Sequence, residues 1–304
     1  MQHQNSKANI KRKRLPFEGE ERENMKNKEC KIIAFANQKG GVGKTTCVVN
    51  FGVILAEKGF QVLIVDLDTQ ANATRYFGIA NPAALPYTIG HALNEAIDNG
   101  AVTFKDAQVY SHKRTPNLYL LGANRNLHKI KTKLTHDIYS GQQALKTVLA
   151  PLKKKGFDYI LIDCAPSLDI DLVNALVAAD DVIIVTNAGT FAFEGAEELM
   201  TSINKIKMGL NPGLDVTGII INSFDGRNRY SPAMEKVMRS KWGDKVFETK
   251  IPRSIKVEES QCQREPIKTY DASNPVSLAF ERLVDEFLVK EAAKDNGSAD
   301  REVR

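Results

Sequence analysis

The chain has 304 residues, of which 42% are hydrophobic and 26% charged, an ordinary composition for a globular protein. This length suits one large α/β domain or two small ones. The four cysteines (Cys30, Cys47, Cys164 and Cys262) form no CxxC pair, which argues against a structural zinc or a disulfide framework and fits a reducing cytosol. Apolar runs are no longer than strands, and the N-terminus lacks the apolar core of a signal peptide. We therefore expect neither membrane spans nor secretion.

Positive charge is in slight excess and is unevenly spread. The chain holds 42 Lys and Arg against 37 Asp and Glu, and the window 221–256 holds nine basic residues against four acidic ones. The local excess of five equals that of the whole chain, +5. Clustered positive charge indicates a polyanionic partner, although solvated helix faces give similar clusters by chance.

Residues 1–29 are polar and contain the run Lys11-Arg12-Lys13-Arg14. Such a segment buries too little apolar surface to offset the entropy lost on ordering, so we predict a disordered basic arm. Its basic run suits contact with nucleic acid, and it equally suits a plain solvated tail.

From residue 31 onward, short apolar runs alternate with helical patterns. The apolar runs predict strands, at 31–36, 61–65, 118–121, 159–162, 182–185 and 216–221. The patterns between them predict helices, at 46–58 (ending at Gly59), 89–98, 141–153, 194–207 and 275–289. Residues 291–304 are predicted to be a polar C-terminal tail.

Strands that are apolar on both faces and alternate with helices predict an α/β fold. The expected architecture is a doubly wound, mostly parallel sheet with helices on both faces. The sequence has no internal repeat and no low-complexity linker, so we predict one domain over residues 30–290.

A glycine-rich turn, N-Q-K-G-G-V-G-K-T-T at 37–46, lies between the first predicted strand and helix. Its glycines permit positive φ, so that successive N–H groups can point at phosphate oxygens beside the positive end of the helix. Lys44 is expected to reach the β- and γ-phosphates, and the Thr45 hydroxyl to join Mg²⁺. The predicted nucleotide-binding residues of this turn are Gly40, Gly41, Val42, Gly43, Lys44, Thr45 and Thr46.

Three carboxylates follow predicted strands at the edge where ligands bind in open α/β sheets. Asp163 ends the strand at 159–162 and is placed to hold a water ligand of Mg²⁺, the Walker B role. Asp66 and Asp68 end the strand at 61–65. The alternative for Asp66 or Asp68 is a structural role, such as capping a helix or pairing with a lysine.

The run K-G-G-V-G-K-T-T resembles the deviant Walker A motif of the ParA/MinD ATPases, with Gln38 where the ordinary motif has its first glycine. Other family segments follow in the expected order. They are D-L-D-T-Q-A-N-A-T at 66–74, D-C-A-P-S at 163–167, I-P-R at 251–253 and Y-D at 270–271. The resemblance covers residues 31–290 and is strongest to the ParA/Soj partition ATPases, whose fold is the P-loop NTPase fold.

This resemblance implies roles for the motif residues. Lys39 would cross a two-fold interface to the partner's ATP and make an ATP-dependent sandwich dimer, with contact to its own nucleotide as the alternative. Asp68 would orient the attacking water. The implied catalytic residues are Lys39, Lys44 and Asp68, and the implied metal residues are Thr45, Asp66 and Asp163. Asn222 and Pro252 match positions that surround adenine, although a strand-end Asn is more often a turn residue.

The resemblance also suggests that the basic window 221–256 contacts DNA. Arg227 and Lys256 fall where Soj-like proteins carry DNA-contacting arginines, and Lys256 keeps the charge that a phosphate contact needs. Such binding would be non-specific and salt-dependent. The alternative is that both are ordinary surface charges.

The function implied by the resemblance is a weak ATP hydrolase that segregates or positions a plasmid or chromosome. The protein would bind ATP and Mg²⁺. Its partners would be a second copy of the chain, non-specific DNA and a ParB-like centromere-binding protein that stimulates hydrolysis. It would be located on the nucleoid, in the cytoplasm. A MinD-like membrane switch is disfavoured, because residues 291–304 contain no Leu, Phe or Trp. A DNA-binding regulator without cargo transport remains an alternative.

Overall fold

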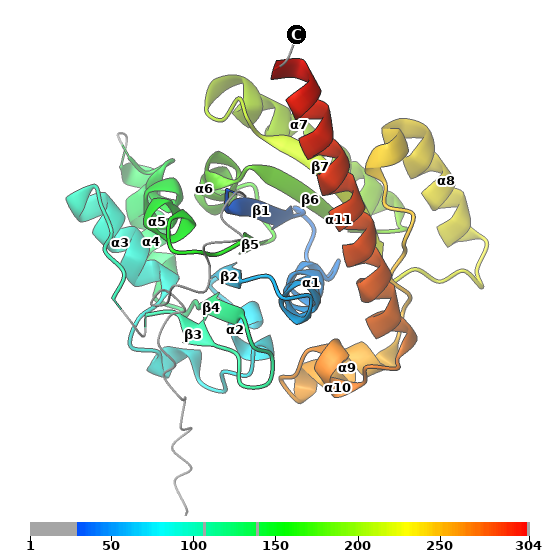
Figure 1. Cartoon of the computed structure of the whole chain (residues 1–304), viewed down its shortest axis with the longest axis horizontal. Helices are drawn as coiled ribbons and strands as arrows, with labels where there is room; N and C mark the ends of the chain where they lie inside the picture. The colour runs from blue at the N-terminus through cyan, green and yellow to red at the C-terminus, as the bar shows by residue number, and fades with distance from the viewer. Residues whose placement is uncertain (1–28, 106–107, 138–139, 303–304) are drawn as a thin grey trace, which may run out of the picture.

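The computed structural model of the chain describes residues 29–105, 108–137 and 140–302. It contains a seven-stranded sheet with the order β3-β4-β2-β5-β1-β6-β7. The strands are β1 (Lys31–Ala36), β2 (Val62–Leu67), β3 (Tyr110–Ser111), β4 (Leu118–Leu121), β5 (Tyr159–Cys164), β6 (Asp181–Asn187) and β7 (Asp215–Asn222). Every pairing is parallel except that of β3 with β4. The predicted fold class is confirmed (Figure 1).

Helices connect the strands and cover both faces of the sheet (Figure 1). The α-helices are α1 (Lys44–Glu57), α2 (Asn72–Tyr76), α3 (Ile89–Asn99), α4 (Leu127–His136), α5 (Ala144–Lys153), α6 (Ile170–Ala178), α7 (Thr190–Gly209), α8 (Tyr230–Trp242), α9 (Ile255–Cys262), α10 (Ile267–Tyr270) and α11 (Pro275–Glu302). Two short 3-10 turns occupy Pro82–Ala84 and Gly243–Lys245.

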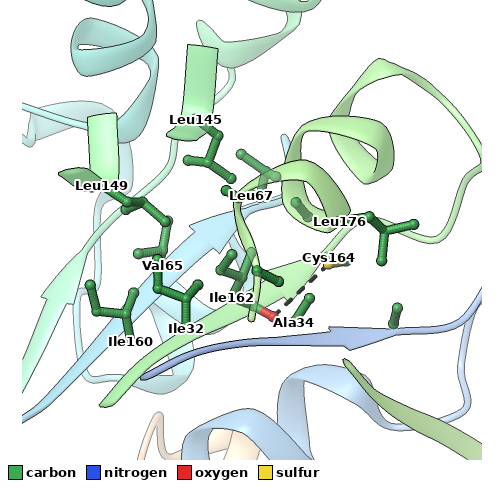
Figure 2. Packing of buried hydrophobic residues seen from close by; sticks show 14 of the residues in the cluster. Ile32, Ala34, Val65, Leu67, Leu145, Leu149, Ile160, Ile162, Cys164 and Leu176 are labelled. Carbon is green, nitrogen blue, oxygen red and sulfur yellow. Dashed lines mark hydrogen bonds between the residues drawn. The ribbon is translucent and has the colours of Figure 1, made fainter. Parts of the chain in front are cut away.

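Alternate residues of each strand enter two separate apolar layers, which is why the strands read as continuous apolar runs. Figure 2 shows part of one layer, in which side chains of the central strands pack beneath α5 and α6. The labelled residues are Ile32, Ala34, Val65, Leu67, Leu145, Leu149, Ile160, Ile162, Cys164 and Leu176. The opposite layer packs on α1 and α11, where Phe51 meets Phe287 with ring centroids 5.1 Å apart. These layers fix the strand ends that carry the site.

The C-terminal segment corrects one boundary predicted from the sequence. The helix predicted at 275–289 is longer than expected, because α11 continues to Glu302 through most of the segment predicted to be a polar tail. Glu291 is buried and pairs with Lys31 at the start of β1, while Lys294 lies 3.1 Å from Asp181 and 3.2 Å from Asp215. Glu291 and Lys294, two of the charges predicted to lie in the tail, are therefore ion-pair partners of residues at the starts of β1, β6 and β7. The basic arm predicted at 1–29 falls outside the described residues except for its last position.

The carboxyl ends of the parallel strands meet at one edge of the sheet, and the predicted site residues follow those ends. The glycine-rich turn leaves β1, the sheet strand that pairs with both β5 and β6. Asp66 and Asp163 are register partners on β2 and β5. Asn222 is the last residue of β7. Sequence positions almost two hundred residues apart are thus brought to one place, as the strand pattern predicts.

Candidate active site

The turn between β1 and α1 depends on glycine at two positions. Gly41 has φ of 75° and Gly43 has φ of 88°, conformations that side chains with a Cβ rarely adopt. A Cβ on Gly43 would also lie 2.1 Å from the Asn222 amide nitrogen, which donates to the Val42 carbonyl at 2.8 Å. Asn222 is therefore in direct contact with the turn, and only glycine fits at position 43.

At the start of α1, two side chains of the motif make polar contacts with groups around the turn. The Thr45 hydroxyl donates to Asp163 Oδ2 at 2.7 Å, and Lys44 Nζ donates to the Lys39 carbonyl at 3.2 Å. The second carboxylate oxygen of Asp163 is buried and has no hydrogen-bond partner among the described residues. A buried oxygen without a partner beside a hydroxyl suits a divalent cation or its water shell.

Burial is the largest influence on the pKa values of Asp163, Asp66 and Lys44. It raises the pKa of Asp163 to about 8, and the nearby charge of Asp66 adds to the rise. It also raises the pKa of Asp66 to about 6, although hydrogen bonds from Thr74 and Asp68 oppose the shift. The pKa of Lys44 is lowered by burial, with the Asp163 charge opposing. Perturbed carboxylates of this kind are characteristic of functional sites.

Asp66 is fully buried and organises the loop that follows β2. Its Oδ2 accepts from the Thr74 backbone at 2.8 Å and from the Thr74 hydroxyl at 2.6 Å, and its Oδ1 accepts from the Asp68 backbone at 3.1 Å. These contacts hold α2 and place Asp68 on the wall of the adjoining cavity. The predicted metal role of Asp66 stays a prediction; its contacts here position the loop.

A cavity of about 530 Å³ opens beside the turn. It brings together Gly40, Gly41, Gly43, Lys44, Thr45, Thr46, Asp68, Asn222 and Pro252, all singled out from the sequence. It is also lined by residues to which the sequence assigned no role, namely Asn72, Arg75 and Tyr76 from α2, and Ser254, Val257, Glu258 and Gln261 from α9 and its cap. The cavity therefore joins a phosphate-binding turn to a partly apolar wall, the combination that a nucleotide requires.

Helix α9 closes one side of this cavity. Gln261 Nε2 donates to the Thr46 hydroxyl at 2.7 Å, which connects α9 to the first turn of α1. The sequence contains a signal for this helix, since Ser254 precedes Glu258 in its first turn and accepts from the Lys256 backbone at 3.3 Å. An N-cap with an acidic first turn would have predicted α9.

The side chain of Lys39 lies outside the cavity. It is not among the described residues that line the cavity, and its Nζ lies 5.4 Å from the ring centroid of Phe191 in the first turn of α7. Phe191 is 73% exposed. The two lysines of the motif thus have different surroundings: Lys44 faces the cavity, and Lys39 lies against an exposed aromatic ring.

The basic window is partly neutralised by carboxylates. Arg227 is 90% exposed and bonds both oxygens of Asp225, at 3.0 and 3.3 Å. Lys256, in the first turn of α9, lies 2.7 Å from Glu259. Glu259 lies outside the window 221–256, so the excess charge counted from the sequence overstates the local field. Arg227 is nevertheless exposed, and Lys256 is half-buried next to the cavity residue Val257.

The comparisons with known proteins identify the family. Residues 30–216, more than half of the chain, match the family model described as AAA domain. Over 262 residues the chain is 34% identical to the chromosome partitioning protein ParA of Caulobacter vibrioides, covering 86% of this chain and 95% of the relative. The chain belongs to the ParA/MinD family of P-loop ATPases. The sequence-based identification is confirmed.

Two further members of the ParA/MinD family illustrate its range. The chromosome-partitioning ATPase Soj of Treponema pallidum is 34% identical over 267 residues, covering 87% of this chain and 99% of the relative. The septum site-determining protein MinD of Pyrococcus horikoshii, solved with Mg-ADP, is 27% identical with a TM-score of 0.67 and coverage of 84% and 95%. Among the described residues, no helix combines the length and apolarity needed to cross a bilayer.

Proposed function

We propose that the chain is an ATP hydrolase whose ATP-bound sandwich dimer binds DNA non-specifically, with hydrolysis resetting a cycle that segregates or positions a plasmid or chromosome. The observation that carries this proposal is that the side chains of the two motif lysines lie in different places. Lys44 lines the nucleotide cavity of its own chain, whereas Lys39 lies outside it beside an exposed ring. A cation that is not engaged by its own phosphate site is free to serve a second one.

Within one chain, the residues present fit Mg-ATP. Backbone N–H groups of the turn and Lys44 would bind the phosphates, while Thr45 and Asp163 would hold Mg²⁺ directly or through water. The described residues contain no group of three or more His, Cys, Asp or Glu able to hold a metal. The remaining ligands would therefore be phosphate oxygens and water. The metal would neutralise charge that develops on the phosphates, and Asp68 would orient the attacking water.

The dimer is tested by Lys39→Ala. Two facing γ-phosphates repel, so a lysine delivered from each side makes association depend on ATP. We expect wild-type protein to dimerise with Mg-ATP in light scattering, and Lys39→Ala to stay monomeric at the same concentration. Lys154→Ala, an exposed lysine after α5, is the control and should dimerise normally. An ATP-dependent dimer of Lys39→Ala as tight as wild type would contradict the proposal.

The DNA surface is tested by the pair Arg227→Ala/Lys256→Ala. Dimerisation doubles the surface, so ATP would control DNA affinity through avidity. We expect weaker binding in filter assays, and a plot of log affinity against log salt that is shallower by about 0.9 for each DNA phosphate that the variant no longer neutralises. The matched control removes two exposed charges, one on α5 and one directly after it, in Lys146→Ala/Lys154→Ala. Equal affinity and equal salt dependence of the test pair and wild type would remove Arg227 and Lys256 from the interface.

A ParB-like protein is the proposed partner that stimulates hydrolysis, and the proposed location of this chain is the nucleoid in the cytoplasm. Similarity to proteins named ParA and Soj supports both. Hydrolysis should be slow alone and faster with DNA and the partner. It would remove the γ-phosphate charge that holds Lys39 across the interface, and so loosen the dimer. If DNA changes neither the rate of ATP hydrolysis nor the oligomeric state, the result would favour a nucleotide switch of another kind.

A further inference from the structure

Arg75 lines the nucleotide cavity on α2, on the same wall as Asp68 and Asn72. None of the family segments includes it. It stands directly after the A-N-A-T segment, and the cavity residues on α9 lie across from its helix. Its side chain is half-buried. A guanidinium that lines a phosphate-binding cavity is a candidate ligand of the substrate's anionic part.

The backbone at Arg75 is held rigidly by the residues on either side. Thr74 is fully buried and donates twice to Asp66. The Tyr76 hydroxyl, also buried, lies 2.9 Å from Ser260 Oγ and 3.3 Å from the Asn50 amide. Residues whose neighbours are locked by hydrogen bonds are suited to hold a ligand group in place. The short helix α2 therefore presents Arg75 from a fixed position.

The donors of Arg75 are largely unused within the described chain. The guanidinium has five N–H donors, of which Nη1 donates to the Gln70 carbonyl. No described carboxylate pairs with it, in contrast to Arg227 and Arg239. Planar guanidinium donors match the oxygens of phosphate in a two-pronged contact. The cavity wall thus presents a guanidinium group most of whose donors have no partner among the described residues.

We propose that Arg75 is a nucleotide-binding residue, donating to phosphate oxygens of the bound nucleotide from the α2 side of the cavity. This inference rests on the proposed nucleotide site. It adds a second cation to the one that Lys44 supplies, carried by the helix that follows the Asp68 loop. The competing role is structural: the contact with Gln70 closes the turn at 70–75, and the charge itself does nothing.

Calorimetry with three ligands separates these roles. Arg75→Ala should bind Mg-ATP and Mg-ADP about tenfold or more weakly, the loss typical of one charge-assisted hydrogen bond, and should bind adenosine as wild type does. Arg75→Gln keeps an amide donor for the Gln70 carbonyl without the charge, and should show the same loss. Arg125→Ala, an exposed arginine before α4 that does not line the cavity, is the matched control and should bind all three normally.

Each other outcome has one meaning. Wild-type affinity for Mg-ATP in Arg75→Gln would overturn the phosphate contact, even if Arg75→Ala were unfolded. An equal loss for adenosine and the phosphorylated ligands would also overturn it, since that pattern reports damage to the cavity. Wild-type protein that binds no Mg-ATP would refute the proposed function itself, a result distinct from failure of the Arg75 contact.

Discussion

A Gly43→Ala variant is expected to lose most of its Mg-ATP affinity and to be markedly less stable without nucleotide. Two separate costs fall on the same position. The φ of 88° at Gly43 is unfavourable for alanine by about 1–2 kcal/mol. In addition, the new Cβ would lie 2.1 Å from the Asn222 amide. Asn222 is buried, so moving it leaves the Val42 carbonyl and its own amide unpaired, at about 1–3 kcal/mol.

Gly41→Ala is the matched control for this experiment. Gly41 also has a positive φ, 75°, but nothing lies within 4 Å of an added Cβ. It should therefore show only the backbone cost in thermal unfolding of the nucleotide-free protein. We expect Gly43→Ala to melt lower than Gly41→Ala by roughly 2–4 °C for each additional kcal/mol. Equal melting temperatures would show that Asn222 yields without cost, and that its bond to Val42 does not hold the turn.

A double variant isolates the contact itself. In Asn222→Ala/Gly43→Ala the clash is gone, while the backbone strain remains. The stability loss of Gly43→Ala should then be smaller when measured against Asn222→Ala than when measured against wild type. This non-additivity is the expected signature of two side chains in direct contact. Additive losses would place the effect of Gly43→Ala in the backbone alone.

The turn and the strands were predictable because their signals are local. Apolar runs predicted six of the strands in the described sheet, and the strands at Lys31–Ala36 and Leu118–Leu121 have the predicted bounds. Since carboxyl ends of parallel strands share one edge, Asp68, Asn222 and the turn could be placed together before any contact was known. The two-residue strand β3 was not predicted, because a segment as short as Tyr110–Ser111 has no alternation of apolar and polar residues to detect.

The rest of the site depends on contacts between distant segments. Helices α2 and α9 are short, with 5 and 8 residues, and neither has an apolar stripe long enough to identify, although Ser254 and Glu258 indicate where α9 begins. They are held by side chains: Thr74 by Asp66, and Gln261 by Thr46. Likewise, the pairing of Lys256 with Glu259 was invisible to a count of charges in a fixed window. Tertiary hydrogen bonds, which a linear pattern does not encode, decide these positions.

An Asp163→Asn variant is expected to be more stable than wild type at pH 8 without nucleotide, yet unable to use Mg²⁺. Burial and the charge of Asp66 raise the pKa of Asp163 from 3.8 to about 8 in the folded chain. The folded state therefore binds more protons than the unfolded state between these values, so its stability falls as pH rises through this window. Asparagine can still accept from Thr45 and carries no charge to desolvate.

The test is a pair of thermal melts, at pH 8 and below pH 4, with and without Mg-ATP. At pH 8 Asp163→Asn should melt at least about 3 °C above wild type, the shift expected from 1 kcal/mol in a chain of this size. Below pH 4 the advantage should vanish, because the Asp163 carboxyl is then protonated in the unfolded state as well as in the folded state. Asp169→Asn, an exposed carboxylate before α6, should show no such gain.

Mg-ATP should reverse the order of stability. A bound ligand stabilises the folded protein by an amount that grows with the logarithm of its affinity, so wild type should gain more than Asp163→Asn. A buried carboxylate that destabilises the empty protein would then be explained by its affinity for the metal, since charge unfavourable in isolation becomes favourable beside a cation. A variant that is less stable than wild type at pH 8, or that gains equally from Mg-ATP, would show that Asp163 is a structural residue instead.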